Sequence, residues 1–260
     1  MLDNDVVRYE VRDRKAYVTI NRPQAMNALS AEVIAKLKMA FAAVDRDNDV
    51  LVAILAGEGG RAFSAGGDLK EMTAHDSAGG NPVFDDVEAA SSCARSVKPV
   101  IAAIDGFAVA GGFELALTCD MRIATAQSRF GMPEPRHSLL GGYGLHHLSR
   151  MIPLGEALHM QLSGITITAQ RAYEIGLLQA VEPDRESMFR KVDLLADEIL
   201  RCAPLAVQAI KRIVTTGRNL PVEYSFKLAR PIEEMVYATE DRIEGPKAFA
   251  EKRRPVWKGK

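Results

Sequence analysis

Residues 100–117 read VIAAIDGFAVAGGFELAL, and this stretch decides the fold class of the 260-residue chain. Its first five residues are all apolar, as is typical of a buried strand. Gly111 and Gly112 follow just before residues of helical character. Glycine at a strand-to-helix junction lets a ligand approach the free amides of the first helical turn. The stretch therefore predicts an α/β fold with an anion-binding turn.

Glu114 follows Gly111 by three residues and shares its face of the predicted helix. Its neighbours Phe113 and Leu115 are apolar, so we expect burial to raise the pKa of this carboxyl group. A second carboxylate, Glu134, comes twenty residues after Glu114, in the sequence FGMPE. Two carboxylates beside an anion-binding turn indicate proton transfer next to a carbonyl group.

A second glycine turn repeats this pattern. Residues 63–69 read FSAGGDL, follow a predicted strand and lead into a helical segment at 69–72. Each turn offers free backbone amides, and two donors are the minimum for holding one oxyanion. The two turns are therefore expected to act together.

The remaining sequence predicts an α/β core with the active site over residues 1–200 and a helical region over 201–260. Strand-like runs at 6–11 and 16–20 flank a charged turn, as in a hairpin, and Ser30 is the expected N-cap of a helix. Polar residues 74–84 predict a surface loop. Further strands are predicted at 51–55, 100–104 and 119–124, and helices at 111–118, 142–150, 154–162, 168–175, 185–202, 203–217, 221–238 and 240–250.

Composition narrows the function classes. A net charge of −1 argues against a nucleic-acid or membrane-surface partner. The longest apolar stretch contains Asp105 and Glu114, so it does not match a membrane span. The three cysteines have no disulfide or metal spacing, and the first residues lack a secretory or transit pattern. We therefore expect a cytoplasmic protein without a metal.

In their order and spacing, these motifs resemble the crotonase superfamily, the enoyl-CoA hydratase/isomerase enzymes. The resemblance covers nearly the whole chain and rests on residues 21–29, 62–72, 98–103, 114–120, 130–134 and 239–253. It implies a spiral of ββα units followed by a C-terminal helical trimerisation region. It also implies an acyl-CoA substrate, whose thioester oxygen is held by the amides of Gly67 and Gly111.

The resemblance further implies where the substrate's coenzyme A portion binds, and it implies no separate cofactor. The expected assembly is a homotrimer or a dimer of trimers. In such an assembly a neighbouring subunit contributes two of the CoA contacts, Phe249 and Lys252. Within the subunit, the implied CoA contacts are Gln24, Ala25, Ala65, Asp68 and Leu69.

The acid–base groups decide the reaction in this family. Family hydratases resemble this chain in carrying glutamate at the positions of both Glu114 and Glu134, whereas many isomerases keep only the second. Two carboxylates suit syn addition of water to a trans-2-enoyl-CoA, because one takes a proton from water while the other delivers a proton to Cα. The alternatives are an isomerase that uses Glu134 alone and a non-catalytic member that binds acyl-CoA or a protein.

The segment after Glu134 departs from the family pattern. Gly141 replaces a proline, and Ser138 and Leu145 replace glycines. These changes lie near the acyl end of the expected site, so they bear on substrate choice more than on reaction type. Arg136 nearby is a candidate for binding a polar acyl group, although a structural or solvated role is the stronger interpretation.

For three other kinds of residue, a structural role is an alternative to the functional one. His146 and His147 have no carboxylate or cysteine partner at ligand spacing, which favours a helix-surface pair over a metal site. Asp68 is also a candidate cap for the helix that follows it. Phe249 is also a candidate for the ordinary hydrophobic core.

Overall fold

The structure, a computed structural model, describes residues 5–68, 71 and 92–260. Leu69, the predicted loop at 74–84 and most of the predicted helical segment at 69–72 lie outside the described residues. Glu71 alone of that segment is described, and it is helical.

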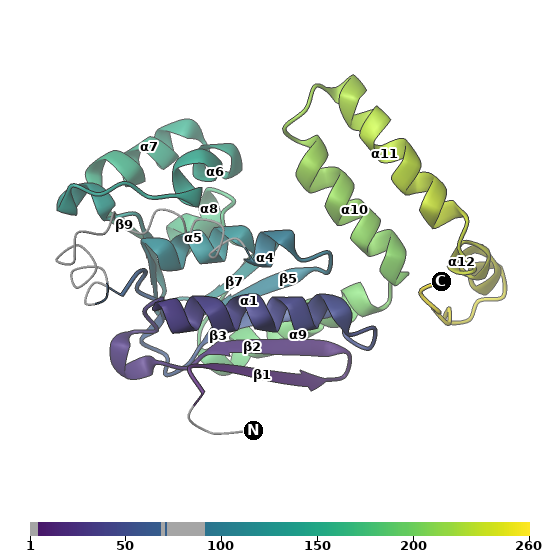
Figure 1. Cartoon of the computed structure of the whole chain (residues 1–260), viewed down its shortest axis with the longest axis horizontal. Coiled ribbons are helices and arrows are strands. Elements are labelled where there is room, and N and C mark those ends of the chain that lie inside the picture. The colour runs from purple at the N-terminus through teal and green to yellow at the C-terminus, as the bar shows by residue number, and fades with distance from the viewer. Residues whose placement is uncertain (1–4, 69–70, 72–91) are drawn as a thin grey trace.

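Two sheets form the centre of the molecule (Figure 1). The larger sheet has the order β1-β2-β3-β5-β7-β10, and it is parallel except for the antiparallel β1–β2 hairpin. The smaller sheet has the order β4-β6-β8-β9, with β9 antiparallel to β8. The strands are β1 Val7–Arg12, β2 Lys15–Ile20, β3 Val52–Gly57, β4 Ala62–Ser64, β5 Val100–Ile104, β6 Phe107–Val109, β7 Met121–Thr125, β8 Arg129–Gly131, β9 Thr166–Thr168 and β10 Ala180–Glu182.

The chain alternates between the two sheets as it advances. In the central repeat β5 joins the larger sheet, β6 joins the smaller sheet, and helix α5 (Gly111–Thr118) follows. β3 with β4, and β7 with β8, divide between the sheets in the same way. This alternation confirms the expected spiral of ββα units, and it places the ends of β4 and β6 side by side.

Helices cover both faces of the larger sheet. Helix α1 (Ala31–Arg46) packs with α5 on one face, and helix α9 (Arg185–Leu200) packs on the other (Figure 1). Successive strand residues point to opposite faces, so Leu55 lies in the α1 core and Ile54 in the α9 core. Because both faces are buried, the central strands are apolar throughout. Ser30 is the N-cap of α1, as predicted, and its Oγ accepts a hydrogen bond from the amide of Val33 at 3.3 Å.

The sequence predicted helices and no strand after residue 140, and this expectation is wrong in two places. The strands β9 and β10 lie within that region and extend the smaller and larger sheets. Each has three residues, which is too short for the two-residue period of a strand to stand out in the sequence. The helices of this region are α6 Tyr143–Met151, α7 Leu154–Ser163, α8 Ala169–Glu174, α9 Arg185–Leu200, α10 Pro204–Gly217, α11 Val222–Tyr237 and α12 Asp241–Ala250.

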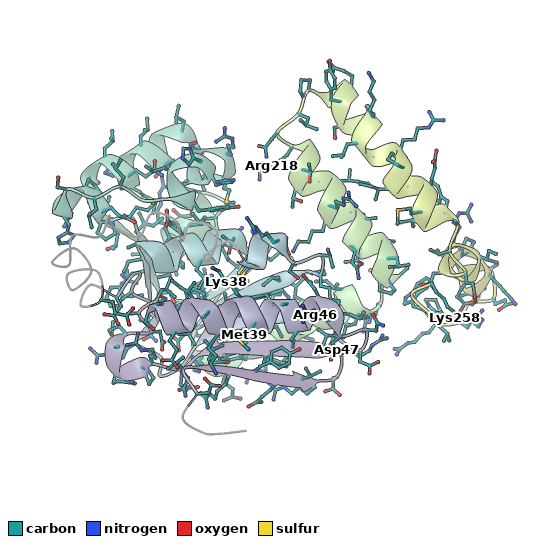
Figure 2. The ribbon with its side chains drawn as sticks, in the orientation of Figure 1. Lys38, Met39, Arg46, Asp47, Arg218 and Lys258 are labelled. Atoms are coloured by element: carbon teal, nitrogen blue, oxygen red, sulfur yellow. The ribbon has the colours of Figure 1, made fainter. Side chains whose placement is uncertain are left out.

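Helices α10, α11 and α12, which we call the arm, extend away from the spiral (Figure 1). Arg218, labelled in Figure 2 between the arm and the spiral, donates a hydrogen bond to the carbonyl of Arg150 in α6. At the far end of the arm, the amides of Lys258 and Gly259 donate to the carboxylate of Asp241 at 2.7 and 2.9 Å. Within the described ranges, no helix has the length and apolarity needed to cross a membrane.

Candidate active site

The two glycine turns lie against each other at the ends of β4 and β6. Gly66 adopts φ +92°, and an ideal Cβ placed on it would lie 3.0 Å from the amide nitrogen of Gly111. Leu29 holds the first turn, because its amide donates to the carbonyl of Gly66 at 2.8 Å and its carbonyl accepts from the amide of Asp68 at 3.3 Å. Gly67 and Gly111 are therefore neighbours, with an ideal Cβ on Gly111 only 3.6 Å from the amide nitrogen of Gly67.

The amides of Gly67 and Gly111 are available to a ligand. Gly111 is the first residue of α5, where an amide has no acceptor within its own helix. Across residues 5–68, 71 and 92–260, neither amide donates a hydrogen bond to another backbone carbonyl. The positive end of the α5 dipole lies at the same place. The two turns thus have the chemistry of an oxyanion-binding site.

Ala110, the N-cap of α5, has a backbone conformation that the sequence did not predict. Its φ of 50° and ψ of −134° are unusual for a residue with a Cβ, and such strain typically costs about 1–3 kcal/mol. Hydrogen bonds on both sides hold it: its amide donates to Gly131 at 3.0 Å, and its carbonyl accepts from Phe113 and Glu114 at 2.9 and 3.0 Å. This turn sets the direction of the neighbouring Gly111 amide.

The structure brings the two glutamates together. Glu114 lies on α5, and Glu134 begins the short 3₁₀ helix η3 (Glu134–His137). Both side chains are buried and both approach the same backbone position. An ideal Cβ on Gly141 would lie 2.9 Å from Oε1 of Glu114 and 3.4 Å from Oε1 of Glu134. Gly141, which departs from the family pattern, is thus in contact distance of both carboxylates.

The two carboxylates differ in their hydrogen bonds. The Gly144 amide donates to Oε1 of Glu114 at 2.8 Å, whereas Oε2 of Glu134 is buried and has no partner in the described part of the chain. Burial raises the pKa of Glu114 to about 6; the Gly144 hydrogen bond opposes this rise, and the charge of Glu134 adds to it. Burial also raises the pKa of Glu134. The predicted rise for Glu114 is confirmed, and groups with such pKa values suit acid–base exchange.

Four of the CoA contacts implied by the resemblance lie in two segments of the described chain, residues 24–25 and the Gly67 turn. Gln24 is exposed and Ala25 is half-buried in the 3₁₀ helix η1 (Pro23–Ala25). Ala65 is half-buried, and its amide donates to the carbonyl of Met26 at 3.0 Å. Leu69 lies outside the described residues.

Asp68, the fourth of these positions, forms an ion pair that sequence reasoning missed. Both terminal nitrogens of Arg22 donate to Oδ2 of Asp68, at 3.1 and 3.0 Å. The side chains are 20% and 13% exposed, so the contact is largely shielded from water. In the sequence, the sign of this contact was the opposite charge of Arg22, beside Pro23, and of the one acidic residue of the glycine turn. The ion pair links the two segments for which the resemblance implies CoA contacts.

Phe249 and Lys252 are not brought to this site within one subunit. Phe249 lies on α12 at the far end of the arm and is 87% exposed, so the interpretation as ordinary core is wrong for this chain. Lys252 is also exposed and follows α12 with φ 54°. The contact of these two residues with the CoA of a neighbouring subunit stays a prediction.

Arg136 and His147 each contact a neighbouring residue of the same chain. Nε of Arg136 donates to the carbonyl of Ser163 at 3.2 Å, at the end of α7, which is a structural contact. His147 stacks on Tyr143 with ring centroids 3.7 Å apart, and its Nδ1 lies 3.0 Å from the Tyr143 carbonyl. Among the residues described, no group of three or more His, Cys, Asp or Glu side chains could hold a metal ion.

Known proteins share this sequence and fold. The family model described as enoyl-CoA hydratase/isomerase matches residues 12–260. The (E)-benzylidenesuccinyl-CoA hydratase of Thauera aromatica is 38% identical, over 97% of this chain and 99% of that protein. The short-chain-enoyl-CoA hydratase of Clostridium acetobutylicum is 34% identical, over 96% of both chains. The crystal structure of an enoyl-CoA hydratase from Mycobacterium tuberculosis H37Rv superposes with a TM-score of 0.89 and 40% identity, covering 99% of this chain and 100% of that one.

The chain belongs to the enoyl-CoA hydratase/isomerase family and has the crotonase fold. It is an enzyme of acyl-CoA metabolism, and its substrate is an acyl-CoA thioester. The structure brings the two glutamates together and the two glycine amides together, and their roles as reacting groups stay a prediction.

Proposed function

We propose that this enzyme is an enoyl-CoA hydratase, which adds water reversibly to a trans-2-enoyl-CoA thioester. The observation that carries the proposal is the approach of Glu114 and Glu134 to the same backbone position, Gly141. Water addition needs two proton-transfer groups near one another. The names of the two curated relatives, both hydratases, support the same reaction.

In the proposed reaction, the amides of Gly67 and Gly111 hold the thioester oxygen. Water attacks Cβ and forms the new C–O bond, while one carboxylate accepts the proton that the water loses. The negative charge moves through Cα to the thioester oxygen until the second carboxylic acid delivers a proton to Cα. The two carboxylates act as a coupled pair across one water, so neither is assigned as the sole base. Each oxyanion donor typically contributes roughly a hundred- to a thousandfold in rate.

The hydration reaction also explains why Glu114 is held in place. An isomerase that used Glu134 alone would leave Glu114 without a role, yet Glu114 is buried and hydrogen-bonded to Gly144. Burying a carboxylate destabilises the protein unless partners compensate for the lost hydration, and a role in hydration would explain why this group is retained. A non-catalytic binding protein would likewise have no use for two carboxyl groups with raised pKa values.

We further propose that the enzyme is a homotrimer or a dimer of trimers in the cytoplasm, with Phe249 and Lys252 reaching the CoA of a neighbouring subunit. Exposed apolar side chains on the arm support an interface there, since large exposed apolar patches usually mark contact surfaces. Phe226, Met235 and Phe249 are 71%, 69% and 87% exposed. We propose no metal and no separate cofactor, because the coenzyme A belongs to the substrate.

A panel of trans-2-enoyl-CoA thioesters tests the reaction and defines the acyl group. The panel should include short straight acyl chains and acyl groups with an aryl substituent, since the names of the relatives cover both types. Loss of the enoyl-thioester absorbance, with formation of a 3-hydroxyacyl-CoA, is the expected result. A product with a displaced double bond would point to the isomerase, and no turnover of any thioester would point to a binding protein.

A further inference from the structure

Gln161, on α7, contacts one residue that holds Glu114 and one residue that lies close to Glu134 in the chain. Its Nε2 donates to the carbonyl of Gly144 at 2.8 Å, and Gly144 is the residue whose amide holds Glu114. The same Nε2 lies 3.5 Å from Sδ of Met132, two residues before Glu134. A single side-chain amide thus bridges the supports of the two carboxylates, although it touches neither carboxylate.

The groups that Gln161 bridges are tightly packed. An ideal Cβ on Gly144 would lie 2.5 Å from Cε of Met132 and 3.2 Å from Oε1 of Glu114. A Cβ on Gly141 would lie 2.6 Å from the same Cε. Only glycine fits at these two positions without displacing a neighbour. A movement of Gly144 therefore changes the position of the amide that donates to Glu114.

We propose that Gln161 is a positioning residue, which holds the Gly144 amide against Glu114 and fixes the spacing between Glu114 and Glu134. The effect on rate rests on the proposed hydratase function, whereas the effect on Glu114 itself does not. Gly144 lies in the first turn of α6, where backbone amides and the helix dipole favour a negative charge. Without the Gln161 hydrogen bond, Gly144 is less constrained, and the ionised form of Glu114 loses part of its stabilisation.

The loss of the Gln161 hydrogen bond should shift the pKa of Glu114 in a defined direction. A hydrogen bond to the ionised form lowers a carboxyl pKa, so weakening the Gly144 bond should raise the pKa of Glu114 further. The other groups that act on Glu114 are the charge of Glu134 on η3 and the amide of Gly142 before α6. Neither group is removed when Gln161 is changed. The acidic limb of the rate profile should therefore move to higher pH.

The substitution Gln161→Met keeps the length of the side chain and removes its donor. We expect kcat to fall roughly ten- to a hundredfold, because misplacement of a catalytic group by about 1 Å can have effects of that size. KM should stay within about twofold, since Gln161 is not among the residues that the resemblance implies to contact CoA. The matched control is Gln170→Met on α8, which removes an exposed amide whose partner is Glu174 at 3.2 Å.

A second measurement does not depend on hydration. Titration of the Glu114 carboxyl carbon by ¹³C NMR in the ligand-free protein should give a higher midpoint in Gln161→Met than in the parent or in Gln170→Met. An unchanged midpoint, with or without a loss of thermal stability, would overturn the positioning role. If the parent enzyme hydrates no enoyl thioester, the proposed function fails, and the titration still decides the role of Gln161.

Discussion

Lys211 of the arm and Asp120 of the spiral form an ion pair, with Nζ and Oδ2 separated by 2.7 Å. The two side chains are 9% and 20% exposed. Nζ of Lys211 also donates to the carbonyl of Lys98 at 2.8 Å, and Oδ2 of Asp120 accepts from the amide of Val100 at 2.7 Å. The arm is therefore attached where β5 begins, the strand that precedes β6 and the Gly111 turn.

Removing this attachment should destabilise the protein. Lys211→Met leaves the Asp120 carboxylate without its cation, and we expect a loss of about 2 kcal/mol, between the values typical of exposed and of buried pairs. Urea denaturation measures the change. The matched control is Lys191→Met, an exposed position on α9, which should have little effect. Equal stability of the two variants would show that the arm does not depend on the ion pair.

The oxyanion donors can be tested at Gly111. Gly111→Pro deletes the amide hydrogen but suits the first position of a helix, so we expect a folded protein that has lost at least roughly a hundredfold in kcat. Gly111→Ala keeps the amide, and its Cβ would meet the nearest protein atom at 3.6 Å, an ordinary contact. It should retain far more turnover. Comparable rates in the two variants would show that the Gly111 amide does not hold the oxyanion.

The raised pKa of Glu114 predicts how stability depends on pH. Its pKa is about 6 in the folded protein, against an ordinary value of 4.5. Between these two pH values, the folded state therefore binds more protons than the unfolded state. Stability should therefore fall as pH rises from about 4.5 to 6, by about 2 kcal/mol from this one group.

Glu114→Gln isolates this contribution, because the other titrating groups are common to both proteins. Urea denaturation at several pH values should show a smaller fall in stability for the variant than for the parent. Parallel pH dependences would mean that Glu114 titrates at its ordinary pKa in the folded protein.

The proposed contact with CoA in a neighbouring subunit is tested at Lys252. Reversing its charge with Lys252→Glu should raise KM for the thioester about tenfold, equivalent to about 1.4 kcal/mol, with kcat little changed. Lys247→Glu, also exposed on the arm, is the control and should leave KM unaltered. Sedimentation of the parent enzyme should show a trimer or hexamer, and a fully active monomer would contradict the contact.

Much of the proposed catalytic arrangement could be predicted from the sequence because it depends on local patterns. The glycines before Glu114 mark a strand-to-helix turn, and its apolar neighbours indicate burial. These features follow from residues adjacent in the chain. The approach of Glu134 to Glu114 could be expected only from the family resemblance, since it depends on where β7 and β8 return the chain.

Other features depend on contacts between distant segments and leave little trace in the sequence. The positive φ of Ala110 occurs in a residue type that seldom adopts it. Gln161 is one of several glutamines in helical sequence, and only the packing of α7 on η3 and α6 brings it to Gly144. β9 and β10 are defined by their partner strands rather than by their own three residues.

The most direct test of the two-carboxylate mechanism is the hydration rate of a trans-2-enoyl-CoA with Glu114→Gln and with Glu134→Gln. Each variant keeps the shape of the side chain and loses its proton-transfer function, so kcat should fall roughly a hundred- to ten-thousandfold while the affinity for acyl-CoA stays nearly unchanged. A Glu114→Gln enzyme that hydrates at nearly the parent rate would contradict the mechanism.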